Sequence, residues 1–434
     1  MDPSRPDYDA LDFFTDASLI ADPYPYYEHL RAKCPVHRHG QHEVVLVTGF
    51  EQGVAIYGDP EHYSSVNAVN GPLPPLPFSP DGDDITAQLE AHRSQLPMAG
   101  LLVTLDRPDH APLRSFVVQL FAPSRLRQGE PAMLAIADRL IDEFADTGAV
   151  ELVRDFGVPF AGLVIADLLG VPQEDRAWFR EMFSTRPRLD QVEDRERYNP
   201  LSFLDDKFSE YMVERRAKPR GDVLSEIANA TLPDGGKPTL EQVVSIATFL
   251  FGAGQDTTAK LLASAMRILA EQPEIQRRVR ADRGLIPAFI EETLRFDGPV
   301  KTSSRLVRKS TEIGGVTLRA GTHVALLNGA MNRDPGKFEA PDEFRLGRPG
   351  VREHLAFGRG PHTCPGAQLA RNEVRISLER LLDRMGDIHL SQEHHGPAGA
   401  RRYRHEPGYV LRGVRRLNLE FEPIGTARPG DKPT

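Results

Sequence analysis

Cys364, one of two cysteines in this 434-residue chain, lies where a glycine-rich loop turns into a helix. The loop reads F-G-R-G-P-H-T-C-P-G from Phe357 to Gly366, and its glycines allow tight bends and close approach of another group. Apolar residues recur at three- and four-residue steps from Ala367 to Met385, which predicts a helix with one buried face. The amide groups and dipole at a helix N-terminus favour a thiolate, and a thiolate is a strong metal ligand.

A single cysteine limits which metal this loop could bind. A structural zinc site needs four protein ligands, and no C-x-x-C pair occurs in the chain. A haem iron needs one protein ligand on its proximal side, and a thiolate pushes electron density onto the iron so that dioxygen is cleaved there. A lone cysteine outside such a loop is more often a buried, inert thiol, which is how we interpret Cys34.

A second group of reactive side chains lies in the middle of the longest predicted helix, Thr239 to Glu271. This helix opens with the T-x-x-Q spacing of a capping box. Its central stretch A-G-Q-D-T-T, residues 253–258, puts glycine, aspartate and threonine in a helix interior, where they are unfavourable. Such a conflict indicates either room for a small ligand, with Asp256 and Thr257 able to move protons, or a notch where another helix packs.

His110 and Arg114 form a third candidate group. They fall one helical turn apart in the predicted helix Leu105 to Phe121, for which Asp106 is the expected N-cap. Two cationic side chains at this spacing form either a solvated basic face or a site for an anionic group between them. The residues alone leave both interpretations open.

The loop around Cys364 resembles the cysteine-ligand loop of the cytochrome P450 monooxygenases, F-G-x-G-x-H-x-C-x-G, at every fixed position. A-G-Q-D-T-T is similar to the A-G-x-D-T-T oxygen-activation motif of that family, and Glu292 and Arg295 match its E-x-x-R motif. The resemblance extends over residues 23–423. It implies a mainly α fold, a helical triangular prism with a small β-rich region, in which Arg348 joins Glu292 and Arg295 in an architectural role.

The resemblance also implies a cofactor, haem b (iron protoporphyrin IX), with Cys364 as the iron ligand. Asp256 and Thr257 would be catalytic, because Thr257 would hydrogen-bond the distal oxygen and Asp256 would relay protons. The other residues implied to bind the cofactor are His110, Arg114, Ala253, Gly254, Arg305, Phe357, Gly358, His362 and Gly366. The four cationic members of this set would pair with the haem propionates.

Composition excludes several classes of function. The net charge of −9, from 53 Lys and Arg against 62 Asp and Glu, gives no electrostatic footprint for nucleic acid. The acidic N-terminus does not look like a signal peptide, and the apolar runs are too short to cross a bilayer. Two cysteines favour a reducing cytoplasm over a disulfide framework. We expect a monomeric, cytoplasmic protein of the soluble bacterial type, one domain over residues 1–434, with 1–20 and 424–434 loosely ordered.

Helices must position most of these residues. Further helices are predicted at 23–33, 129–145, 159–169, 175–183, 201–216, 222–230 and 285–296, and strands at 42–48 and from Arg305 onward. Residues 66–100 carry six prolines, so no long regular element is expected over the first half of this region. In the resembling family this region closes over the substrate.

The resulting hypothesis is a monooxygenase that inserts one atom of dioxygen into a hydrophobic small molecule, by hydroxylation or epoxidation. No G-x-G-x-x-G motif follows a predicted strand, so the electrons would come from a separate protein, which the resemblance implies is a ferredoxin with its reductase. The arginines expected to attract it are Arg107, Arg359, Arg371 and Arg375. The alternatives are a peroxide-driven peroxygenase, which would not need the Asp256–Thr257 pair, and a non-catalytic haem-binding or gas-sensing protein.

Overall fold

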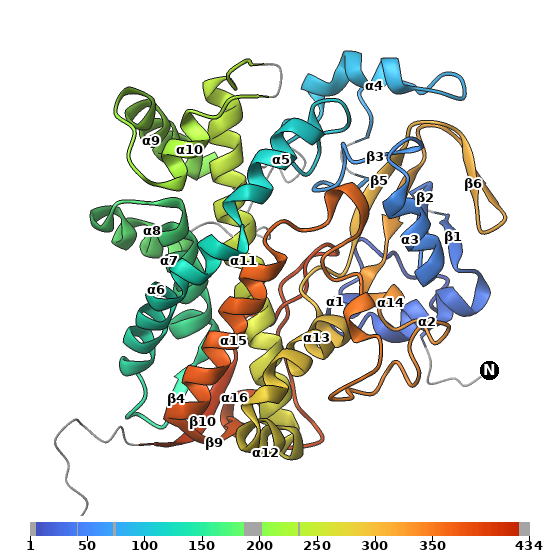
Figure 1. Ribbon diagram of the computed structural model, residues 1–434. Coiled ribbons are helices and arrows are strands. Elements are labelled where there is room, and N and C mark those ends of the chain that lie inside the picture. The colour runs from blue at the N-terminus through green and yellow to red at the C-terminus, as the bar shows by residue number, and fades with distance from the viewer. Residues whose placement is uncertain (1–5, 41, 73–74, 186–201, 233–234, 425–434) are drawn as a thin grey trace, which may run out of the picture.

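The computed structural model describes residues 6–40, 42–72, 75–185, 202–232 and 235–424. Helices make up most of these residues, and they are gathered into one body beside a smaller β-rich region (Figure 1). The prediction of a mainly α fold is therefore confirmed. No helix in the described ranges has the length and apolar character needed to cross a lipid bilayer.

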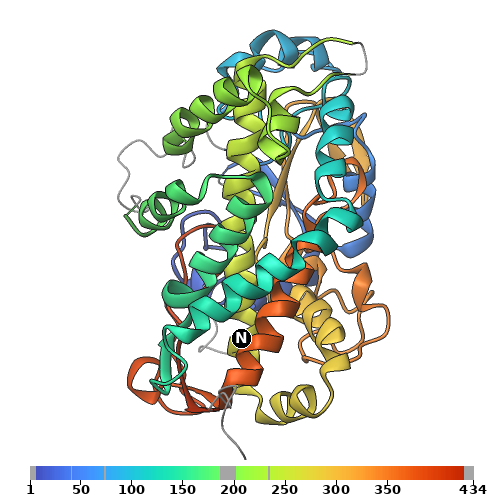
Figure 2. The same ribbon diagram turned by 60° about the vertical axis from the view of Figure 1, so that its left-hand side comes forward.

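The longest helix, α11 (Leu240–Glu271), runs through the whole helical body (Figures 1 and 2). The predicted capping box is confirmed: Gln242 N–H donates to Thr239 Oγ1 at 3.2 Å, and Thr239 N–H donates to Gln242 Oε1 at 2.8 Å. At about 1.5 Å per residue the helix is roughly 48 Å long. The helices that pack most extensively against it are α7 (Val158–Leu169), α9 (Asp205–Ala217), α13 (Ile286–Asp297) and α15 (Ala367–Arg384).

The remaining helices are shorter or lie further from this centre. They are α1 (Ser18–Ala21), α2 (Tyr24–Lys33), α3 (Phe50–Gly58), α4 (Thr86–His92), α5 (His110–Leu120), α6 (Pro123–Asp142), α8 (Arg176–Thr185), α10 (Val223–Ala228), α12 (Pro273–Ala281), α14 (Asn328–Met331) and α16 (Gln392–His395). Among the helices that were not predicted, α12 begins directly at Pro273, because proline fits the first turn of a helix as well as it ends the preceding one.

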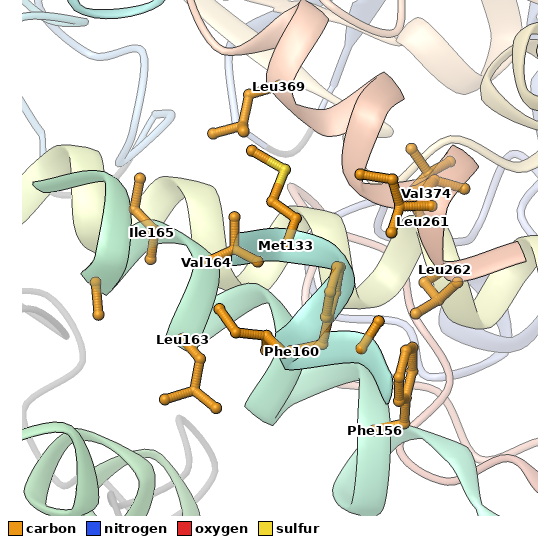
Figure 3. Packing of buried hydrophobic residues seen from close by; sticks show 14 of the residues in the cluster. Met133, Phe156, Phe160, Leu163, Val164, Ile165, Leu261, Leu262, Leu369 and Val374 are labelled. Carbon is orange, nitrogen blue, oxygen red and sulfur yellow. The ribbon is translucent and has the colours of Figure 1, made fainter. Parts of the chain in front are cut away.

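The main hydrophobic core lies where α6, α7, α11 and α15 meet (Figure 3). Met133 of α6, Phe160 and Val164 of α7, Leu261 of α11 and Leu369 of α15 contribute buried side chains to one cluster. Each large side chain buried in this way stabilises the fold by about 1.5–3 kcal/mol. This core fixes α15 against α11, and therefore also fixes the loop that precedes α15.

The β-rich region is built around a five-stranded sheet in the order β1-β2-β8-β5-β3. These strands are β1 (Val36–His39), β2 (Val44–Val47), β3 (Tyr63–Ser64), β5 (Ser303–Val307) and β8 (His323–Leu326). A hairpin of β6 (Thr311–Ile313) and β7 (Val316–Leu318) turns at Gly314 and Gly315, which have φ of 57° and 76°. A separate three-stranded sheet, in the order β4-β10-β9, joins β4 (Ala149–Glu151), β9 (Met385–Leu390) and β10 (Asn418–Pro423).

The expectation of a loosely ordered N-terminus is wrong for residues 6–20. Phe13 and Leu19 are buried, and the Phe13 ring stacks on that of Tyr26 with centroids 6.2 Å apart. The aromatic side chains of this segment are buried in a cluster with side chains of α2, and this packing fixes the segment against the protein. Residues 1–5 and 425–434, where loose order was also expected, lie outside the described residues.

The expected N-cap of α5 is also wrong. The helix begins at His110, and the Asp106 carboxylate accepts hydrogen bonds elsewhere, from Ser65 N–H at 2.9 Å, from Arg93 at 3.0 Å and from the Ser64 hydroxyl. Asp106 therefore ties the start of α5 to the segment that follows β3.

In the 66–100 region, the described residues contain no helix before α4, as predicted. Leu76, Phe78 and Leu96 pack against a small cluster that includes Leu89 of α4 and Leu306 of β5. The apolar side chains of this region therefore anchor it to the five-stranded sheet.

Candidate active site

The loop before α15 is shaped by two glycines in the left-handed region. Gly358 and Gly360 have φ of 64° and 72°, and a Cβ on Gly360 would lie 2.2 Å from the carbonyl oxygen of Tyr57. Only glycine fits there, because the loop backbone passes so close to α3. Cys364 N–H donates to Phe357 O at 2.9 Å and closes the loop.

Cys364 lies three residues before the first residue of α15. Burial raises the pKa of the Cys364 thiol, although a hydrogen bond from Gly366 N–H and the charges of Arg114 and Arg371 act in the opposite direction. Burial thus acts against the thiolate that the helix N-terminus favours. A metal cation that displaces the thiol proton would restore the thiolate.

Glu291 of α13 braces both ends of this loop, which the sequence analysis missed. Its carboxylate accepts from Arg371 Nε at 2.6 Å and contacts His354 Nε2 at 3.1 Å. Burial opposes ionisation, but hydrogen bonds from His354 and Arg371 hold the pKa of Glu291 at about 2. The Arg371 guanidinium also lies 4.7 Å from the centre of the Phe357 ring. One buried carboxylate thus fixes the chain before and after Cys364.

The four cationic residues expected at the propionates come together beside this loop. The rings of His110 and His362 are 3.9 Å apart, and Arg114 donates to the carbonyl of Thr363. Burial lowers the pKa of His110, Arg114 and Arg305. Burial, together with the charges of Arg305, His110 and Arg114, lowers the pKa of His362 to about 2.

This cluster fits an anionic group. In the described part of the chain, no carboxylate forms an ion pair with any of the four, since the nearby Asp106 is paired with Arg93, and the buried His110 Nε2 has no hydrogen-bond partner. The nearby Asp106 already accepts from three other groups. The buried charges of Arg114 and Arg305 disfavour protonation of the two histidines, so a ligand that brings carboxylates to this point would stabilise the arginines and the protonated histidines. The propionates of a haem are such carboxylates.

The middle of α11 is more exposed than the turns that follow it. Ala253, Gly254, Asp256 and Thr257 are partly exposed, whereas the residues from 258 to 266 are all buried. The Thr257 hydroxyl donates to Ala253 O in the preceding turn at 2.8 Å. A Cβ on Gly254 would meet the Ile165 side chain of α7 at 3.4 Å, an ordinary packing distance.

Two acids near this stretch have partners that the sequence analysis did not name. Asp256 is ion-paired with Lys260, one turn further along α11. Glu373 of α15 is buried and accepts a hydrogen bond from the Thr258 hydroxyl at 3.0 Å. Burial raises the pKa of Glu373 to about 8, against the opposing effect of that hydrogen bond. A glutamate one turn after Leu369, on the apolar face of a predicted helix, was the signal that could have found it.

The predicted E-x-x-R architecture is confirmed in its geometry. Arg295 and Glu292 are fully buried and paired through two hydrogen bonds of 2.8 Å, and Arg348 Nε donates to Glu292 Oε1 at 2.9 Å. Arg295 also donates to the carbonyls of Asn332 and Pro341. The triad joins α13 to the long segment that leads to the Cys364 loop.

Comparison with known proteins agrees with this geometry. A sequence model of the family described as Cytochrome P450 matches residues 181–386. Cytochrome P450 144 of Mycobacterium tuberculosis is 37% identical over 388 residues, which cover 88% of this chain and 86% of that protein. Cytochrome P450 CYP150A6 of Mycobacterium marinum, solved in its substrate-free form, is 54% identical with a TM-score of 0.90, over 96% of this chain and 100% of that one. CYP109E1 of Bacillus megaterium, solved with testosterone, is 28% identical with a TM-score of 0.76, over 92% and 99%. The chain belongs to the cytochrome P450 family of haem-dependent monooxygenases.

Proposed function

We propose that this chain binds haem b through Cys364 and inserts one atom of dioxygen into an apolar small molecule, by hydroxylation or epoxidation. The observation that carries the proposal is that Cys364 lies beside two histidines, His110 and His362, and two arginines, Arg114 and Arg305, none of which has a carboxylate partner among the described residues. His110, Arg114, Arg305 and His362 would hold the propionates. Phe357, Gly358 and Gly366 would shape the loop on the cysteine side of the haem. Ala253 and Gly254 would line the opposite face of the haem.

The bound haem would supply the iron at which dioxygen is activated. The chain's own contribution is to deliver protons. Thr257 Oγ1 can turn from Ala253 O and donate its hydrogen bond to a ligand in the open face of α11. The Asp256 carboxylate, one residue earlier, can take up a proton from solvent and relay it as the next one. The balance requires two electrons and two protons, with one oxygen atom going to the substrate and the other to water.

The substrate is proposed to be apolar, because Phe249 and Leu250 lie on α11 one turn before Ala253, and because the segments of Phe78 and Val300 border the substrate in the resembling family. CYP109E1 was solved with testosterone, so a steroid is a reasonable first probe. Testosterone and a set of fatty acids, terpenoids and aromatic molecules would be screened for a shift of the haem absorption band. A shift with an apolar compound would support the proposal, and shifts with polar compounds alone would contradict it.

The electron donor is proposed to be a ferredoxin, served by its reductase. Of the arginines expected to attract it, Arg371 is paired with Glu291, and Arg375 is paired with Glu130 at 2.7 Å and Glu379 at 2.9 Å. Arg107 and Arg359 are exposed, so we assign them the larger share of the attraction. A cytoplasmic monomer with a single domain over residues 1–434 is part of the same proposal.

Replacing Thr257 by Ala tests the proton path against the two alternatives. We expect haem binding to be retained while electrons are diverted into hydrogen peroxide, measured as peroxide released per electron supplied. Thr248→Ala is the matched control, because its hydroxyl, on the same helix, donates to Asp205 of α9 at 2.9 Å. Well-coupled turnover in the Thr257 variant would refute the role of Thr257. A wild type that uses peroxide but no electrons would be a peroxygenase, and one that does neither would be a sensor.

A further inference from the structure

Lys260 lies on α11, and its side chain is buried in the protein. Its side chain is 5% exposed, and its ammonium lies between two carboxylates, Asp256 on its own helix and Glu406 at 2.9 Å. A buried ammonium needs anionic partners to offset its desolvation, and here two acids share one cation. Asp256 is 21% exposed and Glu406 is 42% exposed, so Glu406 is the partner that reaches solvent.

Glu406 comes from a C-terminal hairpin that also holds the stem of Lys260. The hairpin is closed by the bridge between His405 and Val414 and by a hydrogen bond from Glu406 N–H to Gly413 O at 3.0 Å. A Cβ on Gly413 would lie 2.5 Å from Lys260 Cγ, so the lysine stem occupies the space that a larger residue would fill. The position of Lys260 therefore depends on this hairpin.

The same hairpin is joined to the segment that borders the proposed substrate space. Val300 forms a β-bridge with Leu411, and Lys301 N–H donates to Val410 O at 2.9 Å. A shift of the 300–303 segment would thus be passed to the hairpin that carries Glu406. Lys260 is the point at which that movement reaches Asp256.

We propose that Lys260 is a positioning residue that restrains the Asp256 carboxylate, and that Glu406 weakens this restraint by sharing the Lys260 ammonium. The inference rests on the proposed role of Asp256 as proton relay. A carboxylate paired with a fixed ammonium must leave that pair before it can turn and deliver a proton. Removing the competing charge of Glu406 tightens the pair, whereas removing the charge of Lys260 takes away one restraint on Asp256. The two changes therefore act in opposite directions.

The test measures substrate-free dioxygen consumption by the haem-loaded protein, driven by NADPH through a plant-type ferredoxin and its reductase, in H2O and in D2O. Glu406→Gln is expected to slow consumption about two- to fivefold and to increase the solvent isotope effect. The expected change is modest because the charge that is removed is partly exposed to solvent. Lys260→Gln is expected to accelerate consumption by a similar factor and to reduce the isotope effect. Gly413→Ala, which displaces the Lys260 stem without changing charge, should follow Lys260→Gln, and Lys260→Arg should restore the wild-type rate.

Glu393→Gln, which removes an exposed carboxylate from α16, is the control and should change neither value. The effect of Glu406→Gln should vanish when combined with Lys260→Gln or with Asp256→Asn. The unfolding midpoints of Asp256→Asn, Lys260→Gln and their double variant should be non-additive, which reports the ion pair independently of activity. Equal or same-direction effects of the Glu406 and Lys260 changes would overturn the inference. An Asp256→Asn variant with wild-type rates would instead refute the proposed function.

Discussion

Replacing Glu373 by Gln should make the protein more stable at neutral and alkaline pH. Burial raises the pKa of Glu373 to about 8 from an ordinary value of 4.5, so the carboxyl is protonated in the folded chain and ionised in the unfolded one at pH 7. The folded state then binds the extra proton, and the free energy of unfolding falls as pH rises between these two values. Each unit of pKa difference corresponds to about 1.36 kcal/mol, which gives an upper bound of about 5 kcal/mol.

Glutamine keeps an acceptor for the Thr258 hydroxyl and carries no proton to lose. The stability difference between Glu373→Gln and wild type should therefore grow by up to about 1.4 kcal/mol per pH unit, or about 2 kcal/mol from pH 6 to about pH 7.5. Guanidinium unfolding of the haem-loaded proteins, followed by circular dichroism, measures it. The matched control is Glu379→Gln on the same helix, whose carboxylate is partly exposed and paired with Arg375. A difference that does not change with pH, or that shrinks, would refute the assignment of Glu373 as a neutral buried acid.

Two further variants test the buried charges of the scaffold. Glu292→Gln leaves Arg295 and Arg348 buried without their acid, so we expect a loss of about 3–5 kcal/mol in chemical denaturation, accompanied by poor haem incorporation. Burial and the nearby Arg412 charge lower the pKa of Lys301 to about 8, which means that its ammonium form is disfavoured in the folded chain. Wild-type stability should therefore rise between about pH 8 and pH 10, and Lys301→Met should remove that rise and gain up to about 3 kcal/mol at pH 7. A flat profile in wild type would contradict the pKa shift of Lys301.

Features determined by neighbouring residues could be predicted from the sequence. The capping box of α11 depends on Thr239 and Gln242, and the Glu292–Arg295 pair depends on a three-residue helical spacing, so both were accessible. The helical spacing of His110 and Arg114 also predicted that these two lie on one face. That they lie close to Arg305 and His362 could be predicted only from the family resemblance.

Features that depend on distant partners could not be predicted. The three-stranded sheet pairs Val150 with Leu419, and no local pattern connects strands so far apart. Lys260 and Glu406 are 146 positions apart (406 − 260), so their ion pair was invisible in the sequence. Asp106 had the right residue type for an N-cap, yet its carboxylate binds Arg93 and Ser65, because tertiary partners outweighed the local preference.

Coordination of haem iron by the Cys364 sulfur is the central claim, and the carbon monoxide adduct of the reduced protein tests it most directly. We predict that the reconstituted wild type and Cys34→Ser, which removes the other free cysteine, both give the red-shifted absorption produced by sulfur coordination. Cys364→Ser should lose that absorption while the propionate cluster still retains some haem. A wild type that binds no haem, or a Cys364→Ser variant that keeps the red-shifted band, would contradict the claim.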